Sequence, residues 1–194
     1  MQQVAHAKPL KPEGFAHPRS NVAALGLQSG MRVVDFGAGS GAYVLSIAER
    51  LEGSGVVYAI DVQRELLRRI HNEAQRRGYK NVEVIWADLE TPRASKLADS
   101  SIDLVLISNL LFQVPDKAPV LREARRIVKP VGRVAVIDWA ESFGGMGPVE
   151  EDVVSKGNAI ELAGKSGLDL EREFVAGAHH YGLMFRPAPT HTHA

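Results

Sequence analysis

Cysteine is absent from this chain of 194 residues, and its absence removes several kinds of chemistry. Without thiols the protein forms no disulfide, has no thiolate nucleophile and offers no cysteine-based metal site. No apolar run approaches the roughly 20 residues that a membrane-spanning helix needs, and the N-terminus lacks a signal-peptide pattern. We therefore expect a cytoplasmic protein without a membrane span.

An excess of charge of either sign is also missing. The chain has 23 basic and 23 acidic residues, and its formal net charge is +0. A protein whose main partner is nucleic acid usually carries a basic excess, so nucleic acid is disfavoured as a partner. Hydrophobic residues make up 45% of the chain, which is ample for one α/β core at this length.

The ends of the chain differ from its middle. Residues 1–17 carry Lys8-Pro9, Lys11-Pro12 and Gly14 with little helical or strand periodicity, and we interpret them as a flexible N-terminal arm. One domain is expected over 18–186, followed by a disordered tail over 187–194. The tail contains His191 and His193, which we interpret as part of an unstructured terminus, so no metal site is predicted.

A glycine-rich turn between two predicted strands organises the sequence. A strand over 32–36 leads into the turn with Gly37, Gly39 and Gly41, then a helix over 43–51 and a strand over 56–60 that ends at Asp61. This βαβ arrangement places the turn and the acid at the carboxyl edge of a parallel sheet, where open α/β folds bind ligands. Asp61 follows Gly41 by 20 residues, a spacing suited to a ribose diol.

Two nucleoside cofactors could use this turn. Gly37, Gly39 and Ala42 satisfy the looser dinucleotide pattern G-x-G-x-x-G/A, which predicts a nicotinamide cofactor. However, Asp35 stands two residues before the first glycine. Its carboxylate would repel a pyrophosphate but would attract the ammonium and sulfonium groups of S-adenosylmethionine. The local sequence therefore favours S-adenosylmethionine and leaves the dinucleotide as the alternative.

The remaining chain alternates helices and strands. Helices are expected over 19–25, 63–78, 110–114, 117–128 and 150–167, and strands over 81–86, 104–107, 133–138, 168–176 and 179–186. A turn at 130–132 should separate the 117–128 helix from its strand, and 139–148 should be a loop that could contact a substrate. The last two strands are joined by only two residues, so they should form an antiparallel hairpin.

Polar residues follow two of the predicted strands. Asp88 comes just after the third strand and could accept a hydrogen bond from an exocyclic amine, or it could simply stabilise a turn. Ser108 and Asn109 follow the fourth strand at the same edge. The arginines of the 63–78 helix are interrupted by Glu65 and Glu73, which favours a solvated face over a nucleic-acid patch.

Residues 18–186 resemble the class I S-adenosylmethionine-dependent methyltransferases, in the small-molecule branch that includes the ubiquinone/menaquinone-biosynthesis type. The resemblance rests on the segments 33–41, 58–61, 87–88, 102–109, 126–133, 137–139 and 180–182. It implies an α/β fold: a Rossmann-like three-layer αβα sandwich around a seven-stranded, mostly parallel sheet with an antiparallel last strand.

The resemblance also implies a set of cofactor-binding residues: Asp35, Gly37, Ala38, Gly39, Gly41, Asp61, Val62, Asp88, Leu89, Ser108 and Asn109. Asp35 would lie near the methionine ammonium, Asp61 would bind both ribose hydroxyls, and Asp88 would bind the adenine amine. Val62 and Leu89 would sandwich the adenine. Tyr43 either covers the methionine end or packs under the N-terminal arm.

The implied reaction is an in-line displacement that moves the sulfonium methyl to a small-molecule acceptor and leaves S-adenosylhomocysteine. The acceptor is expected beside Asn109, Trp139 and Phe143. Relatives often carry a histidine soon after the fourth strand, where this chain has Phe112. The catalytic residue therefore stays open.

The candidates for a general base are Asp138, His179, His180 and Tyr181, with Asp138 and His180 retained. The absence of cysteine excludes a thiol-dependent arsenic methylation. Alternatives for the whole protein are an RNA or protein methyltransferase and a non-catalytic S-adenosylmethionine-binding protein. We expect a monomer or a homodimer.

Overall fold

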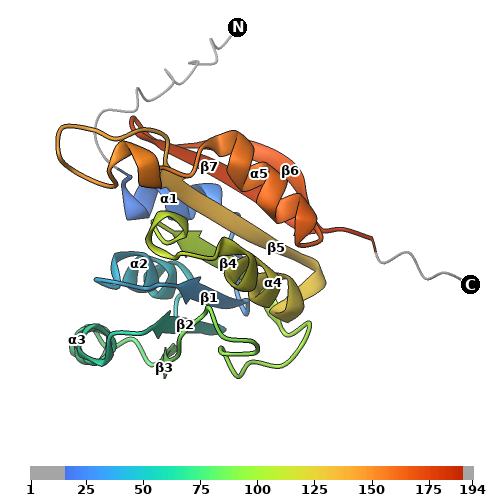
Figure 1. The fold of residues 1–194 in the computed structure, drawn as a ribbon. Helices are drawn as coiled ribbons and strands as arrows, with labels where there is room; N and C mark the ends of the chain where they lie inside the picture. The colour runs from blue at the N-terminus through green and yellow to red at the C-terminus, as the bar shows by residue number, and fades with distance from the viewer. Residues whose placement is uncertain (1–15, 190–194) are drawn as a thin grey trace, which may run out of the picture.

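The computed structural model describes residues 16–189 as alternating helices and strands (Figure 1). The strands are β1 (Arg32–Phe36), β2 (Val56–Asp61), β3 (Val82–Trp86), β4 (Ile102–Ser108), β5 (Val128–Trp139), β6 (Leu168–Gly177) and β7 (His180–Pro187). The helices are α1 (Pro18–Ala24), α2 (Ala42–Arg50), α3 (Arg64–Arg76), α4 (Lys117–Ile127) and α5 (Lys156–Lys165), with 3-10 turns η1 (Leu111–Gln113) and η2 (Glu150–Asp152).

All seven strands form one sheet in the order β3-β2-β1-β4-β5-β7-β6. The first five are parallel, and β7 runs antiparallel to both of its neighbours, β5 and β6. The predicted seven-stranded, mostly parallel sheet with an antiparallel last strand is therefore confirmed. The strand order reverses between β1 and β4, and a crevice opens at such a point beyond the carboxyl ends of the strands.

Helices cover both faces of the sheet. Helices α1, α2 and α3 share one apolar cluster with one side of the strands, and α4 and α5 share a second cluster with the other side. The central strands contribute to both clusters: Val33 and Leu106 face the first, and Val34 and Ile107 face the second. This explains why their sequences are almost wholly apolar.

The structure corrects two predicted boundaries. The helix expected over 150–167 begins only at Lys156, because Ser155 caps it by accepting a hydrogen bond from the Asn158 amide. The turn expected at 130–132 is instead an irregularity inside β5, since Ile102 pairs with Val128 but Leu104 pairs with Arg133.

The expected N-terminal arm and tail lie largely outside the described residues, as do His191 and His193. Strand β7 extends to Pro187, the first residue of the expected tail. Within 16–189 the structure has no helix long and apolar enough to cross a membrane.

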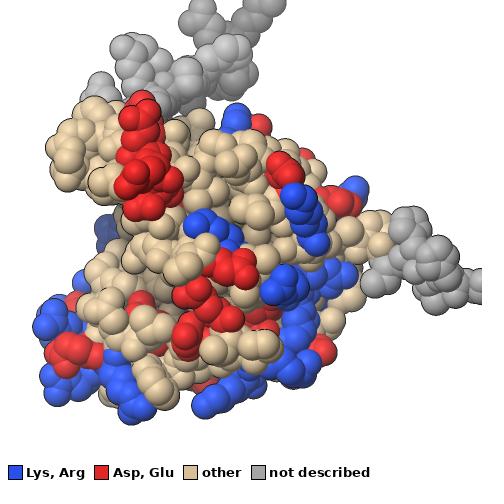
Figure 2. Space-filling model, viewed as in Figure 1, with Lys and Arg blue, Asp and Glu red and all other residues tan. Residues whose placement is uncertain are grey.

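The arginines of α3 lie on its exposed side, and most of them pair with acids of the same helix, while Arg64 lies over the Trp86 ring, 3.9 Å from its centroid. Arg68 and Arg69 contact Glu65, and Arg76 and Arg77 contact Glu73. Figure 2 shows basic and acidic side chains interspersed on the viewed face. This arrangement agrees with the interpretation of a solvated helix face.

Candidate functional site

The glycine turn after β1 is fixed to the neighbouring strand β2. The amides of Gly37 and Ala38 both donate to the carbonyl oxygen of Ile60, each at 2.9 Å. Gly37, Gly39 and Gly41 all have positive φ angles, a conformation that side chains disfavour. A β-carbon at Gly41 would also lie 2.5 Å from Ile70, so the turn is compatible only with bare backbone there.

Gly39 differs from the other two glycines because its α-carbon faces open space. The nearest atom to a β-carbon there would be the Gly37 carbonyl oxygen at 3.8 Å, and Gly39 lines the main pocket of this edge. The missing side chain leaves the backbone open toward the pocket, which is the arrangement that the predicted ligand approach would need.

Asp61 at the end of β2 is buried and is held by two backbone amides. Its Oδ2 accepts from the Gly39 amide at 2.9 Å, and its Oδ1 accepts from the Gln63 amide at 2.8 Å. A carboxylate has about four acceptor positions, so two amides leave capacity for ligand hydroxyls. The structure therefore presents a pre-oriented acceptor group at the pocket wall.

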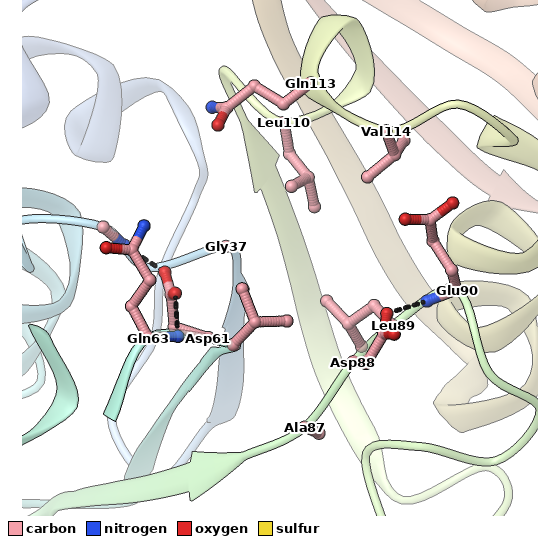
Figure 3. A pocket seen from close by; sticks show the side chains of 12 residues that line it. Gly37, Asp61, Gln63, Ala87, Asp88, Leu89, Glu90, Leu110, Gln113 and Val114 are labelled. Carbon is pink, nitrogen blue, oxygen red and sulfur yellow. Dashed lines mark hydrogen bonds between the residues drawn. The ribbon is translucent and has the colours of Figure 1, made fainter. Parts of the chain in front are cut away.

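The pocket itself has a volume of about 220 Å³ and lies between the ends of β1, β2 and β3 and the segment after β4 (Figure 3). Asp61 and Asp88 lie on opposite sides of it, and Leu110, Gln113 and Val114 form a further wall. Asp88 also accepts a hydrogen bond from the Glu90 amide at 3.0 Å. It therefore stabilises its own turn and lines the pocket at once.

Asp35 lies behind the glycine turn and is almost fully buried. Its Oδ1 has no hydrogen-bond partner among the described residues. Burial, reinforced by the nearby negative charge of Asp61, raises the pKa of Asp35 to about 8. A cationic ligand group would restore its usual ionisation, so the environment fits an ammonium and opposes an anion.

Tyr43 and Ser108 lie near Asp35. The Tyr43 hydroxyl accepts a 2.8 Å hydrogen bond from the Asn21 side chain, so Tyr43 packs under α1. Burial raises the pKa of Tyr43, to which the charge of Asp35 adds. Ser108 is buried at the end of β4.

Asn109 makes the sharp turn out of β4, with a φ of 51°. Its amide donates to the Ile137 carbonyl at 2.8 Å, which ties the turn to β5, and its Oδ1 is buried without a partner among the described residues. Asp138 fixes the next segment: its oxygens accept from the amides of Leu111 at 3.0 Å and Trp139 at 2.9 Å. Burial raises the pKa of Asp138 to about 6.

A second cavity of about 280 Å³ continues along the same sheet edge, lined by Ala16, Asn109, Trp139, Met146 and His180. The His180 ring is tilted against Trp139 with ring centroids 4.3 Å apart. Both ring nitrogens are buried without a partner among the described residues. Burial lowers the pKa of His180, and the neighbouring His179 adds to this effect.

The other two base candidates are engaged elsewhere. His179 contacts Glu141 at 2.8 Å and stacks on Phe143 with centroids 3.7 Å apart. The Tyr181 hydroxyl donates to the Val154 carbonyl at 2.9 Å. Neither His179 nor Tyr181 lines either of these two cavities.

A comparison of the sequence with models of known protein families identifies the family of this chain. Residues 27–175 match the family model described as a methyltransferase domain. The chain belongs to this methyltransferase family. The resemblance stated from the sequence is therefore confirmed.

Individual methyltransferases agree with this assignment. The chain is 30% identical over 123 residues to a demethylmenaquinone methyltransferase of Bacillus velezensis, covering 62% of this chain and 51% of that protein. It is 34% identical over 116 residues to an arsenite methyltransferase of Aquipseudomonas alcaligenes, covering 58% of this chain and 34% of that protein. These matches span about half, or less, of the relatives' length.

A solved structure covers nearly the whole chain. The crystal structure of a methyltransferase from Aquifex aeolicus, described as SAM dependent, has a TM-score of 0.80 and 27% identity. The match covers 90% of this chain and 91% of that one. The Rossmann-like fold of this methyltransferase is thereby confirmed.

The structure brings most of the predicted site residues to one edge. Six of them line the first pocket: Gly37, Gly39, Asp61, Val62, Asp88 and Leu89. Asp35, Ala38 and Gly41 are buried in or behind the turn, Ser108 is buried at the end of β4, and Asn109 lines the second cavity. Among the expected acceptor neighbours, Trp139 lines that cavity and Phe143 does not.

Sequence reasoning missed several pocket residues: Gln63, Ala87, Glu90, Leu110, Gln113 and Val114. Leu110 had a detectable signal, because it directly follows the polar pair that ends β4. Within 16–189 no group of three or more His, Asp or Glu side chains is placed to bind a metal.

Proposed function

We propose that the protein transfers a methyl group from S-adenosylmethionine to a small-molecule acceptor. The observation that carries this proposal is the bond between the Gly39 amide and Asp61 at a pocket wall, with the buried Asp35 behind the same turn. The open backbone at Gly39 could lie against the methionine part of this cofactor. The oriented carboxylate of Asp61 and the buried carboxyl group of Asp35 could bind its ribose hydroxyls and its ammonium group.

The residues fit the cofactor group by group. Asp61 would bind the ribose hydroxyls with its remaining lone pairs, and Asp35 would bind the methionine ammonium. Val62 and Leu89, on the pocket wall, would contact the adenine, and Asp88 would accept from its amine. When bound, S-adenosylmethionine supplies a methyl group already activated by its sulfonium charge. The chain then has to orient the acceptor and exclude water.

A nicotinamide dinucleotide fits less well. Its pyrophosphate would have to lie at a turn whose two buried carboxyl groups already disfavour negative charge, since burial and, to a lesser degree, repulsion by Asp61 raise the pKa of Asp35. An additional anion would increase that repulsion. The electrostatics of the turn thus support the sulfonium cofactor.

The balance of charge supports a small acceptor rather than RNA. Arg68, Arg69 and Arg76 of α3 are paired with acids of the same helix, and the net charge of the chain is zero. A channel for a phosphate backbone would need unpaired basic side chains. An organic acceptor is favoured over arsenite because the chain has no cysteine.

Calorimetry with purified protein tests the proposal. S-adenosylmethionine and S-adenosylhomocysteine should both bind, with dissociation constants on the order of micromolar. Asp61→Asn should weaken both about tenfold or more, because it replaces charge-assisted hydrogen bonds. The matched control is Asp169→Asn in β6, at the far edge of the sheet, which should bind normally. Heat with a nicotinamide dinucleotide and none with either sulfur compound would overturn the proposal.

A further inference from the structure

The antiparallel direction of β7 brings its first residue to the edge where the parallel strands end. Trp139, the last residue of β5, pairs with His180, the first residue of β7. Asn109 reaches the same place from β4, and its amide is bonded to β5 through Ile137. Three strands therefore supply side chains to the second cavity, directly beside the cofactor pocket.

Consecutive residues of the turn after β4 line the two cavities. Asn109 lines the second cavity, while the next residue, Leu110, lines the first. Leu110 also packs on the glycine turn, since a β-carbon at Gly37 would lie 2.9 Å from its Cδ1. A molecule in the second cavity would thus contact Asn109, whose neighbour in the chain, Leu110, lines the cofactor pocket.

The lining of the second cavity indicates what kind of molecule it accepts. Trp139, Met146 and Ala16 offer apolar and aromatic surface, and the described residues that line it include no Lys, Arg, Asp or Glu. An ionised acceptor would lose its hydration there without a compensating charge. A flat, uncharged ring system is favoured instead.

Two polar groups in this apolar lining lack partners in the described chain. One is the imidazole ring of His180, with its two nitrogens, and the other is the side-chain amide of Asn109, with its Oδ1. His180 is 7% exposed, so its unpartnered nitrogens are an energetic cost in the free protein. A ligand with a hydroxyl group would satisfy one of these nitrogens, because a hydroxyl donates a hydrogen bond to a neutral imidazole.

We propose that this cavity binds the methyl acceptor, that the acceptor is a neutral aromatic hydroxyl compound, and that His180 is the catalytic base that accepts the hydroxyl proton. This inference rests on the proposed methyltransferase function. The hydroxyl oxygen forms a bond to the methyl carbon as the methyl–sulfur bond breaks, and the bonding electron pair passes to sulfur. The proton moves to a ring nitrogen of His180 and then to water.

The state of His180 suits this task. Burial and the adjacent His179 lower the pKa of His180, so the ring is neutral and able to accept a proton at neutral pH. Met146 of the loop over 140–147 lines the cavity, so a shift of this loop would widen access to the buried nitrogens. Gly144, Gly145 and Gly147 in this loop have positive φ angles, and Met146 at the cavity is 46% exposed.

A two-stage titration separates this inference from the proposed function. S-adenosylhomocysteine is first titrated into the full-length protein, and failure at this stage refutes the cofactor proposal. Three probes that share the naphthalene ring and are similar in size are then titrated into the saturated complex: 2-naphthol, 2-naphthoate and 2-naphthylmethylammonium. The neutral hydroxyl compound should bind at least tenfold more tightly than either ion.

Variants of His180 test its role. His180→Phe preserves a flat ring against Trp139 but removes both nitrogens, and His180→Gln preserves a hydrogen-bonding group without a useful base. Both should bind S-adenosylhomocysteine as the wild type does. With S-adenosylmethionine and 2-naphthol, both should lower kcat about 100-fold or more, while His180→Gln should keep KM within about threefold. His71→Gln, at an exposed histidine of α3 that lines neither cavity, is the matched control and should change kcat less than threefold.

Three results would overturn the inference. Normal cofactor binding combined with equal or tighter binding of an ion would refute the acceptor class. A kcat of His180→Phe and His180→Gln close to that of the wild type would refute the base. Cofactor binding without any binding or methylation of 2-naphthol would refute the assignment of this cavity to aromatic hydroxyl compounds.

Discussion

The Gly39 amide donates a 2.9 Å hydrogen bond to Oδ2 of Asp61, joining the turn after β1 to the end of β2. This bond orients the carboxylate at the pocket wall and leaves the Gly39 α-carbon facing the open pocket. Several expectations about ligand binding and stability depend on this edge of the sheet.

Replacing Gly39 by Ala should block the cofactor. The substitution costs about 1–2 kcal/mol of stability because φ is +51°, and its methyl group also projects into the pocket. We expect S-adenosylhomocysteine affinity to fall at least tenfold in calorimetry. Gly144→Ala is the control, since φ there is +55° and no atom lies within 4 Å of the added methyl. Equal loss of affinity in both variants would contradict this explanation.

The affinity for S-adenosylmethionine should rise with pH between about 6 and 8. The free protein holds Asp35 protonated below its pKa of about 8, whereas the cofactor ammonium requires the carboxylate. Binding in this range therefore releases a proton, and each pH unit lost costs up to about tenfold in affinity. Calorimetry at pH 7 in two buffers of different ionisation enthalpy should detect the release. Asp35→Asn should abolish it and weaken binding.

The same carboxyl group should affect the stability of the free protein in the opposite direction. Because the folded pKa of Asp35 exceeds the ordinary value of 3.8, the folded state binds the proton more tightly than the unfolded state. This contribution to stability is full below about pH 4 and is lost as pH rises through about 8. Denaturant unfolding of wild type and Asp35→Asn at pH 6 and pH 9 should therefore show a larger decline for the wild type.

Asp138 should prove to be a positioning residue rather than a base. Both of its oxygens accept backbone hydrogen bonds, from Leu111 and Trp139. Asp138→Asn replaces one acceptor oxygen by a donor and should cost about 1–3 kcal/mol in denaturant unfolding. Activity with a probe that the wild type methylates should fall less than tenfold. A loss as large as that of His180→Gln would contradict this expectation.

A buried ion pair on the face opposite the glycine turn should dominate the stability of α4. Glu123 is 4% exposed and binds both Arg126 and Ser95, with its Oε1 accepting from the Ser95 amide at 3.1 Å. Glu123→Ala removes buried hydrogen bonds to Ser95 and Arg126, while Arg126 keeps its ion pair with Asp99, so the change should cost about 1–3 kcal/mol. Glu65→Ala removes exposed pairs of α3 and should cost less than about 1 kcal/mol. Equal losses of unfolding free energy in Glu123→Ala and Glu65→Ala would contradict this prediction.

Much of the cofactor edge could be predicted because its determinants are local. The turn at Gly37–Gly41 and the acid at Asp61 belong to one βαβ unit, whose pattern fixes both strand direction and loop position. The hairpin of β6 and β7 followed from its two-residue connection.

The second cavity could not be predicted to the same depth because its determinants are distant in the chain. Asn109, Trp139 and His180 meet only through the sheet order and the antiparallel insertion of β7. The irregularity in β5 likewise depends on close packing, since a β-carbon at Gly132 would lie 2.8 Å from the Asp103 carbonyl. The delayed start of α5 reflects a competition between apolar spacing and the cap at Ser155, which periodicity alone does not resolve.

Because β7 runs antiparallel, two different segments of the chain line the two cavities. Gly37, Gly39 and Asp61 line the proposed cofactor pocket from the earlier segment, and Trp139, Met146 and His180 form most of the lining of the proposed acceptor cavity. Substitutions in the later segment can thus alter which compound is modified while the earlier segment keeps its geometry. A library of variants confined to the later segment should therefore change the accepted compounds with little effect on cofactor binding.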